Sequence, residues 1–439
     1  MRQKKIHYIY NDAMECMDFD ERKKLQGERL RATVELEYNN VPAYRKRMDE
    51  AGVKPEDING IEDIVKLPFT QKTDLRDNFP YGLFAADLKD IVRIQGSSGT
   101  TGKPIVSGYT ENDIKVWTEM VARALTAAGG TKDDIIQIAY GYGLFTGGLG
   151  AHQGATEIGA TVIPMSSGNT QRQIIMMKEL GATMLCCTPS YATYLAETIH
   201  EMGIKPEELK LKSGCFGAEP WTEEMRQHLE DLLDFDALDI YGLTEIGGPG
   251  VAFECMEKHG MHINEDHVLA EIIDPVTEEP LPDDTPGELV FTTLTKTGVI
   301  RYRTHDICTL HHGTCACGRT TVKMSRITGR TDDMLVVRGV NVFPSQIEAV
   351  LMGVKEASAH YMLVVDRVNS QDKLTVQVEL KDDVDINDAD KLEKLAAYIK
   401  TQIKQTLLIS AKVELLPPKS IARSEGKAKR ITDNRNTGF

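Results

Sequence analysis

The sequence predicts an α/β protein, with a large N-terminal domain of parallel α/β layers and a small α+β domain at the C-terminus. Three observations lead to this fold class. The chain has 439 residues, more than one hydrophobic core usually serves. Between about residues 90 and 300, short apolar runs alternate with helical stretches, as in a mostly parallel layer. After Asp332 the pattern becomes that of a compact α+β unit, so we expect domains at residues 1–331 and 332–439.

The N-terminal domain is expected to open with helix, because residues 20–50 combine charged, helix-favouring side chains with periodic Leu, Val and Tyr. The later runs IIQIAYGY, ATVIPM and TMLCCTP predict buried strands. A segment rich in Pro, Asp and Gly at 274–288 predicts surface turns before the strand ELVFTTL. We find no internal repeat and no low-complexity tract.

The C-terminal domain is predicted from three strands, YMLVVDR, LTVQVEL and KVELLPP, and a helix at about 388–405. At the domain junction, the segment 327–348 carries Gly, Arg and two adjacent Asp, a composition that suits a hinge. Pro344 is well placed to begin the helix that follows.

Composition excludes several classes of function. The chain has 51 basic and 66 acidic residues, a net charge of −15, and no basic block that could follow a nucleic-acid backbone. No apolar run reaches the roughly 18 residues of a membrane span, and the N-terminus lacks the apolar core of a secretory signal. We therefore expect a cytoplasmic protein. Its eight scattered cysteines suit reduced thiols, and a metal ligand set, better than a disulfide framework.

The segment GSSGTTGKP at 96–104 combines three glycines with four hydroxyl side chains and one lysine. Glycines let the backbone approach phosphates, and the hydroxyls and the lysine supply donors and a cation. The P-loop motif fails twice, because Ser97 stands at its first Gly position and Pro104 at its final Ser or Thr position. A flexible linker is the alternative. Because apparent strands flank the segment, we favour a phosphate-binding turn.

Three further segments place polar residues at apparent strand ends, where open α/β sheets bind ligands. They are GAEP at 217–220, DIYGLTE at 239–245 and RYRTHD at 301–306. Glu245 could hold Mg²⁺ against phosphates, and Thr244 could donate to a phosphate oxygen. Taken singly, these segments could equally be helix caps or a surface ion pair. Similarly, the basic stretch RSEGKAKR at 423–430 alone would be a solvated surface loop.

Cysteine spacing suggests a structural Zn²⁺ site. Cys315 and Cys317 form a Cys-x-Cys pair, which Cys255 and either His259 or His262 could complete. Four N and S ligands close a tetrahedral site and leave no position for catalysis. We prefer His262, because the turn-like sequence KHGMH can bring it to the same point as Cys255. Buried cysteines without metal are the alternative.

Together, in this order, the motifs resemble the adenylate-forming enzymes, which include acyl-CoA synthetases, adenylation domains and luciferases. Four longer strings, LPFTQKTDLRDNFP, YGYGLFTGGLGAHQGA, EDHVLAEIIDP and RGVNVFPSQIE, are similar to the phenylacetate-CoA ligase family. The resemblance covers nearly the whole chain. One departure is His305 in RTHD, where many relatives have Gly.

The resemblance implies a ligase that uses ATP and Mg²⁺ to join a carboxylic acid to coenzyme A. The carboxylate attacks the α-phosphorus of ATP to give acyl-AMP and pyrophosphate, and the CoA thiol then releases AMP. An arylacetate such as phenylacetate is favoured as the acid. The alternatives are another aryl or acyl acid, or a nucleotide- and zinc-binding protein without turnover. Retention of both Glu245 and Lys427 argues against the latter.

The resemblance also implies roles for individual residues. Thr244 and Glu245 would address the α-phosphate and Mg²⁺, and Lys427 would bridge carboxylate and ATP. Asp306 would take the ribose with Arg330 nearby. The residues expected to bind ATP are Ser97, Ser98, Gly99, Thr100, Thr101, Gly102, Lys103, Ala218, Glu219, Pro220, Asp239, Tyr241, Gly242, Thr244, Asp306 and Arg330.

For the second half-reaction, the resemblance implies that the small domain rotates about a hinge, for which Asp332 is our candidate. Gly339, Val340 and Asn341 would then face the pantetheine arm of CoA. The acyl pocket is expected to include Tyr142, Phe145 and Gly217, although ordinary core aromatics are the alternative for the two rings. We expect small-molecule substrates only, without nucleic acid or membrane, and leave a homodimer open.

Overall fold

The computed structural model describes residues 6–97, 105–331, 335–337, 340–368, 371–407, 409–424 and 428–435. These residues form two compact units. The first comprises residues 1–188, 205–218 and 235–326, and the second comprises residues 189–204, 219–234 and 327–439.

The first unit contains a nine-stranded mixed sheet. Its strands, in spatial order, are β13 (Leu310–His311), β14 (Lys323–Met324), β9 (Met261–Ile263), β8 (Gly248–Glu254), β7 (Asp236–Leu243), β6 (Ser213–Gly217), β5 (Met184–Cys187), β3 (Ile135–Ile138) and β4 (Thr161–Pro164). From β7 to β4 every pairing is parallel. From β7 to β13 every pairing is antiparallel. The predicted parallel layer is therefore half of a larger sheet.

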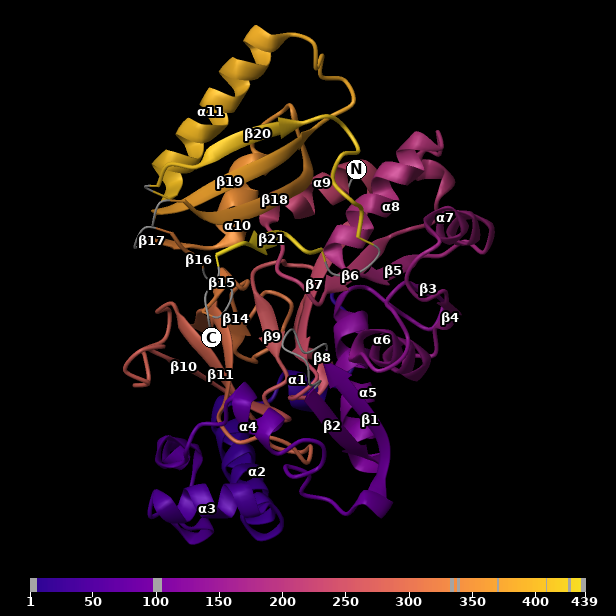
Figure 1. The fold of residues 1–439 in the computed structure, drawn as a ribbon. Helices are drawn as coiled ribbons and strands as arrows, with labels where there is room; N and C mark the ends of the chain where they lie inside the picture. The colour runs from indigo at the N-terminus through magenta and orange to yellow at the C-terminus, as the bar shows by residue number, and fades with distance from the viewer. Residues whose placement is uncertain are drawn as a thin grey trace. The chain divides into compact units, whose positions relative to one another are not determined.

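Along the chain, the helices of the first unit either precede β3 or connect the parallel strands of the sheet. They are α1 (Asp12–Glu15), α2 (Phe19–Asn40), α3 (Pro42–Glu50), α4 (Lys72–Asp77), α5 (Glu111–Ala127), α6 (Thr146–Glu157) and α7 (Thr170–Glu179), with single 3₁₀ turns at Pro55–Asp57, Ile61–Lys66, Leu88–Asp90 and Pro206–Glu208. Helices α2 and α3 occupy the region that the sequence predicts to be helical. Helices α5 and α6 lie side by side against β8 (Figure 1).

Helix α5 shows how local sequence positions the core. A reciprocal capping box begins it, in which the Thr110 hydroxyl accepts from the Asp113 N–H at 3.2 Å and the Asp113 carboxylate accepts from the Thr110 N–H at 2.8 Å. The helix then buries Trp117, Met120 and Val121 in the cluster that contains Ile138 of β3. Apolar spacing on one helix face thus matches a buried strand of the sheet.

Two smaller sheets complete the first unit. Strands β1 (Ile91–Ser97) and β2 (Ile105–Thr110) form an antiparallel pair in which Ser97 lies opposite Ile105. Strands β10 (Val268–Ile273), β11 (Gly287–Thr293) and β12 (Tyr302–Cys308) pair antiparallel in that order. Both strands predicted around the glycine-rich segment are present, as is the strand predicted from ELVFTTL.

The second unit is an α+β assembly. Its sheet has the order β20 (Lys412–Leu416), β19 (Gln371–Leu380), β18 (Ala357–Val368) and β21 (Ile431–Asp433), and the other elements are α8 (Pro189–Glu201), α9 (Glu223–Leu233), α10 (Pro344–Met352), α11 (Ala389–Leu407), β15 (Gly329–Arg330) and the hairpin β16 (Leu335–Val337) with β17 (Val340–Val342). The predicted C-terminal strands correspond to β18, β19 and β20, and the predicted helix corresponds to α11. Pro344 begins α10 as expected.

The unit also includes α8 and α9, which the sequence placed with the N-terminal layer. The domain boundary predicted between residues 331 and 332 remains a prediction, and residues 332–334 lie outside the described residues. In the described part of the chain, no helix combines the length and apolar character that a membrane span requires.

A buried ion pair ties α5 to the chain between β9 and β10. Arg123 is 1% exposed, and its guanidinium donates to both Asp266 carboxylate oxygens at 2.7 and 2.9 Å and to the Asn264 amide oxygen at 2.9 Å. Burial acts to raise the pKa of Asp266, but the hydrogen bonds from Arg123 lead the opposing effects and hold it at about 2. The pair is bidentate and almost fully desolvated.

Removing Asp266 would leave the buried Arg123 guanidinium with the partly exposed Glu119 as its remaining carboxylate partner, so much of its charge would lose compensation. We expect Asp266→Ala to lower the free energy of unfolding by about 3–5 kcal/mol, measured by denaturant titration. The exposed Asp133→Ala should change it by no more than about 0.5 kcal/mol. Because the folded pKa is depressed, the contribution is complete above the unfolded pKa of about 4 and declines as pH falls toward 2. Equal stability of the two variants would contradict this account.

Candidate active site and metal centre

Strands β7 and β12 bring several of the predicted ATP-binding residues together. The Tyr241 hydroxyl, on β7, donates to the Asp306 carboxylate of β12 at 2.5 Å. In return, the Tyr302 hydroxyl of β12 donates to the Glu245 carboxylate just beyond β7 at 3.1 Å. Asp306 and Glu245 are 3% and 5% exposed. Each strand therefore supplies one tyrosine and one carboxylate to a reciprocal arrangement.

The end of β7 is also fixed from β2. The Tyr109 hydroxyl donates to the Thr244 carbonyl at 2.9 Å, and the Tyr109 ring is fully buried. Gly242 allows the close approach of the next strand, because a Cβ at that position would lie 1.8 Å from the Gly248 carbonyl oxygen. Upstream, the Asp239 N–H donates to the buried Glu254 carboxylate at 2.8 Å. The predicted segment 239–245 is thus held from both sides.

Of the glycine-rich segment, the structure describes Gly96 and Ser97. The predicted phosphate contacts Ser98, Gly99, Thr100, Thr101, Gly102 and Lys103 lie outside the described residues. The Gly96 N–H donates to the Leu144 carbonyl at 2.7 Å. This hydrogen bond places the end of β1 beside the segment predicted to line the acyl pocket.

The predicted adenine border is divided between the two units. Ala218 is the last residue of one segment of the first unit and has a φ of +75°, a left-handed conformation that is rare for a residue with a Cβ. Glu219 and Pro220 begin a segment of the second unit. The Glu219 carboxylate accepts from the Ser190 N–H at 2.7 Å and from the Ala428 N–H at 2.9 Å. Sequence reasoning did not anticipate these backbone partners of Glu219.

In the predicted acyl segment, the Tyr142 hydroxyl and the His152 Nδ1 lie 3.1 Å apart, and the rings meet edge to face at 5.9 Å between centroids. Burial raises the pKa of Tyr142 to about 12. Phe145 caps the start of α6 and is 52% exposed. Gly217 ends β6, where a Cβ would lie 2.0 Å from the Ile240 carbonyl oxygen. His152 was missed because only the chain reversal between β3 and α6 brings it back to Tyr142.

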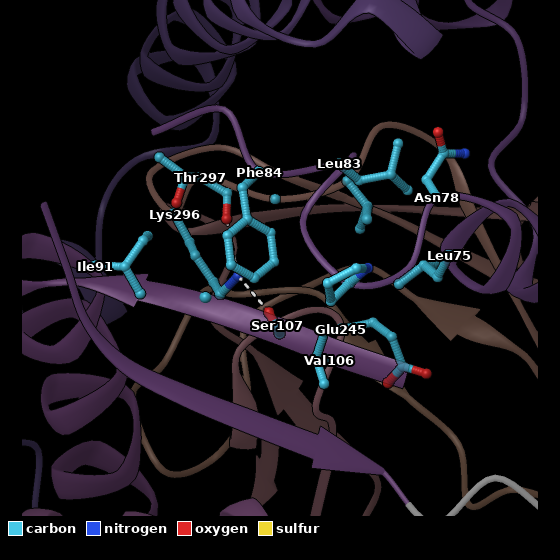
Figure 2. Close-up of a pocket in the computed structure, with 14 residues that line it drawn as sticks. Leu75, Asn78, Leu83, Phe84, Ile91, Val106, Ser107, Glu245, Lys296 and Thr297 are labelled. Carbon is cyan, nitrogen blue, oxygen red and sulfur yellow. Dashed lines mark hydrogen bonds between the residues drawn. The ribbon is translucent and has the colours of Figure 1, made fainter. Parts of the chain in front are cut away.

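A pocket behind β2 contains functional groups that sequence reasoning also missed (Figure 2). Glu245 lines it together with Ser107, Lys296 and Thr297, and apolar side chains from Leu75 to Ile91 form another wall. Lys296 is 5% exposed, and its Nζ donates to the Ser107 hydroxyl at 3.0 Å. Burial lowers the pKa of Lys296 despite the opposing carboxylates around it. A lone lysine in TTLTKTG gives no sequence signal of this burial.

The four residues grouped in the sequence as metal ligands converge. Cys255, His262, Cys315 and Cys317 are all buried, and one donor atom from each lies within 4.8 Å of all the others. The Cys255 and Cys315 sulfurs are 3.9 Å apart, and the Cys317 sulfur is 3.5 Å from His262 Nε2. Burial lowers the pKa of His262, and a hydrogen bond with Cys255 lowers the pKa of Cys317. A neutral imidazole and a thiolate are the forms that bind metal.

The surroundings orient these donors. His262 Nδ1 lies 3.0 Å from the Thr321 hydroxyl, which leaves Nε2 directed at the sulfurs. Arg319 is fully buried and donates to the Cys317 sulfur at 3.6 Å and to the Glu15 carboxylate at 2.6 Å. The cluster is a closed N and S donor set, suitable for a structural metal.

The remaining predicted residues are described in part. Asp332, Gly339 and Lys427 lie outside the described residues. Val340 and Asn341 belong to β17, where their backbones pair with β16. Arg330 lies in β15 of the second unit, and its place beside Asp306 stays a prediction.

Comparison with known proteins identifies the family. Residues 11–295 match the family model for AMP-binding enzyme, and residues 339–435 match the one for AMP-binding enzyme C-terminal domain. The chain is 47% identical to a phenylacetate-coenzyme A ligase of Thermus thermophilus, with 97% of this chain and 100% of that protein covered. It belongs to the phenylacetate-CoA ligase family. The Pseudomonas putida ligase of the same name is 49% identical, with 97% of each chain covered.

A solved structure supports the same fold and reaction class. The chain is similar to 2-hydroxyisobutyryl-CoA ligase in complex with an acyl-AMP, with a TM-score of 0.91, 28% identity, and coverage of 97% of this chain and 92% of that one. Phenylacetate-CoA ligase family membership thus establishes an adenylate-forming fold with a large N-terminal and a small C-terminal domain. The chain is an AMP-forming enzyme that ligates an acid to CoA with ATP through an acyl-adenylate.

Proposed function

We propose that the acid is phenylacetate or a closely related arylacetate. The main support is that the chain is 47–49% identical to four phenylacetate-coenzyme A ligases along at least 95% of its length. An edge-to-face pair of Tyr142 and His152, beside Gly-rich backbone, supports a flat aromatic group as the ligand.

In the proposed ATP site, Thr244 and Glu245 address the α-phosphate and Mg²⁺, and Asp306 takes the ribose with Arg330. Tyr241 then has two roles, because it borders the adenine and orients Asp306 through its hydroxyl. Support comes from the burial of Asp306 and Glu245, each of which accepts a tyrosine hydroxyl from the neighbouring strand. The glycine-rich segment supplies hydroxyl and backbone donors to the β- and γ-phosphates.

Adenylation and thioester formation have different electrostatic needs. Attack on the α-phosphorus concentrates negative charge on phosphate oxygens, and a lysine is the cation best suited to bridge them and the attacking carboxylate. We assign this role to Lys427. Thioester formation needs access for the pantetheine thiol instead, so the small domain would rotate about Asp332. The backbone at Gly339, Val340 and Asn341 would then face the pantetheine arm.

We further propose that the Cys and His cluster holds structural Zn²⁺. The cysteine sulfur and histidine nitrogen donors favour zinc over magnesium, because thiolate and imidazole are poor ligands for hard cations. The metal would stabilise the antiparallel half of the sheet, because His262 lies on β9 and Cys255 directly follows β8. Because β7 and β8 are antiparallel, Cys255 after the end of β8 lies toward the start of β7, whereas Glu245 follows the end of β7. The proposed structural metal and the catalytic Mg²⁺ would therefore lie at opposite ends of these strands.

A cytoplasmic location is consistent with eight cysteines that form no disulfide in the structure. Small molecules are the expected partners, and a homodimer stays a prediction.

The acid is identified by thioester formation with a panel of carboxylates. We expect kcat/KM to be highest for phenylacetate, with one added methylene reducing it by about 10-fold or more. The control is carboxylate-dependent exchange of labelled pyrophosphate into ATP, which detects adenylation directly. Preference for 2-hydroxyisobutyrate would overturn the arylacetate assignment, and absence of exchange with every acid would favour a non-catalytic nucleotide-binding protein.

Lys427→Ala should reduce adenylation by about 10²-fold or more, because a cation that stabilises the transition state is lost. Thioester formation from supplied acyl-AMP should persist, and Lys429→Ala, which removes the neighbouring charge, should affect adenylation much less. Asp332→Pro should restrict rotation and change the two half-reactions unequally. Equal losses in both half-reactions for Lys427→Ala would contradict the assigned role.

Metal analysis should give about one Zn per chain, since four donors complete one tetrahedral site. Cys315→Ser should lose the metal and lower the melting temperature, because metal binding is linked to folding. Thr321→Val should weaken Zn²⁺ affinity by about 10-fold through lost orientation of His262. As a matched control, the buried Cys308→Ala should retain zinc. Retention of zinc by Cys315→Ser would show that the ligand assignment is wrong.

A further inference from the structure

The Lys296 side chain occupies a position that is unfavourable for an ammonium group on its own. It lies between β11 and β12 and is 5% exposed. Besides Ser107, its Nζ donates to the Thr297 carbonyl at 2.8 Å and lies 4.7 Å from the centre of the Tyr109 ring. Burial of a charge is costly unless hydrogen bonds and opposing charges compensate it. These contacts supply part of that compensation.

The segment that carries Lys296 is fixed from two helices. The Asp113 carboxylate of α5 accepts from the Thr297 N–H at 3.0 Å and from the Thr297 hydroxyl at 2.8 Å. The Glu37 carboxylate of α2 accepts from the Gly298 N–H at 3.1 Å. Lys296 is therefore presented at a defined position by the main chain around it.

From this position, Lys296 contacts β2 directly and the Thr244–Glu245 segment through Tyr109. Ser107 and Tyr109 belong to β2, the strand that follows the glycine-rich segment, and Tyr109 is in turn bonded to the Thr244 carbonyl. Glu245 lines the same pocket (Figure 2). One buried cation thus joins the strand leaving the phosphate-binding turn to the segment that carries Thr244 and Glu245.

We propose that Lys296 is a positioning residue for adenylation, which fixes β2 relative to the Thr244–Glu245 segment. It acts through Ser107 and Tyr109 and does not itself bind the phosphates. The proposal deepens the function proposed above, since it rests on these segments forming the ATP site. Its charge also partly offsets the negative charge that Glu245 and ATP bring to one place.

If Lys296 contributed only to stability, the folded Lys296→Met variant would keep wild-type rates in both half-reactions. Lys296 Nζ donates to the Ser107 hydroxyl and the Thr297 carbonyl, which are both uncharged, so its replacement by Met does not separate a hydrogen-bonded ion pair. In Lys296→Met, Asp113 keeps its Thr297 and Thr110 donors, and Glu245 keeps the Tyr302 hydroxyl. Burial also raises the pKa of Glu37 to about 8, so this group is largely neutral near pH 7. We therefore expect the variant to fold.

The test compares the two half-reactions of Lys296→Met. We expect kcat/KM for ATP in pyrophosphate exchange to fall by about 10- to 100-fold, the size of effect of a lost positioning interaction in a transition state. Thioester formation from supplied acyl-AMP should stay within about twofold of wild type. Lys296→Arg should restore part of the adenylation rate. Lys115→Met, which removes an exposed lysine from α5, is the control and should match wild type.

The proposal is overturned if folded Lys296→Met retains wild-type ATP kinetics, or if both half-reactions fall equally. Should Lys296→Met fail to fold, Ser107→Ala decides, because it removes only the hydroxyl that accepts from Nζ. Ser107→Ala should lower kcat/KM for ATP and spare the thioester step, and unchanged ATP kinetics would contradict the proposal. Each ratio is measured with the acid that the wild-type panel selects. A wrong arylacetate assignment therefore appears in the wild type, whereas a wrong role for Lys296 appears only in the variants.

Discussion

Two tyrosine-to-carboxylate hydrogen bonds, exchanged between β7 and β12, fix the geometry on which the proposed ATP site depends. The nine-stranded sheet contributes Tyr241 and Glu245, and the β10–β12 layer contributes Asp306 and Tyr302. Neither sheet alone would hold both carboxylates. Because all four groups are at least partly desolvated, each hydrogen bond is stronger than it would be in water, and loss of either would leave a buried carboxylate undersatisfied.

The first unit also buries several charged side chains. Arg123, Lys296 and Arg319 are each at most 5% exposed, and each has hydrogen-bonded partners from segments distant in sequence. Buried ionic groups contribute little net stability but resist alternative packing, because a misplaced charge would be unpaired. We infer that they define how helices and loops meet the sheets, while the apolar clusters provide most of the free energy of folding.

The sequence was sufficient for features that depend on local patterns. Apolar runs predicted β3, β4 and β5, and turn-forming residues predicted the surface turns that precede β11. Spacing of Cys255, His262, Cys315 and Cys317 was enough to group four residues that converge across the fold. The antiparallel half of the large sheet was not predicted, because its short strands have no distinctive periodicity. Lys296, His152 and the partners of Glu219 could not be found, since a side chain's burial and partner depend on long-range topology.

The pairing of Tyr142 with His152 has a consequence for fidelity. A phenol hydroxyl that donates to a neighbouring ring nitrogen can meet a polar substituent on a substrate only as a hydrogen-bond acceptor, so it does not select for an acceptor substituent. In the proposed acyl pocket, acids would then be sorted by shape, and shape alone separates neighbours that differ by one methylene by only about 10- to 200-fold. The ratio of products from competing acids would therefore depend on their relative concentrations as well as on this modest ratio of kcat/KM values.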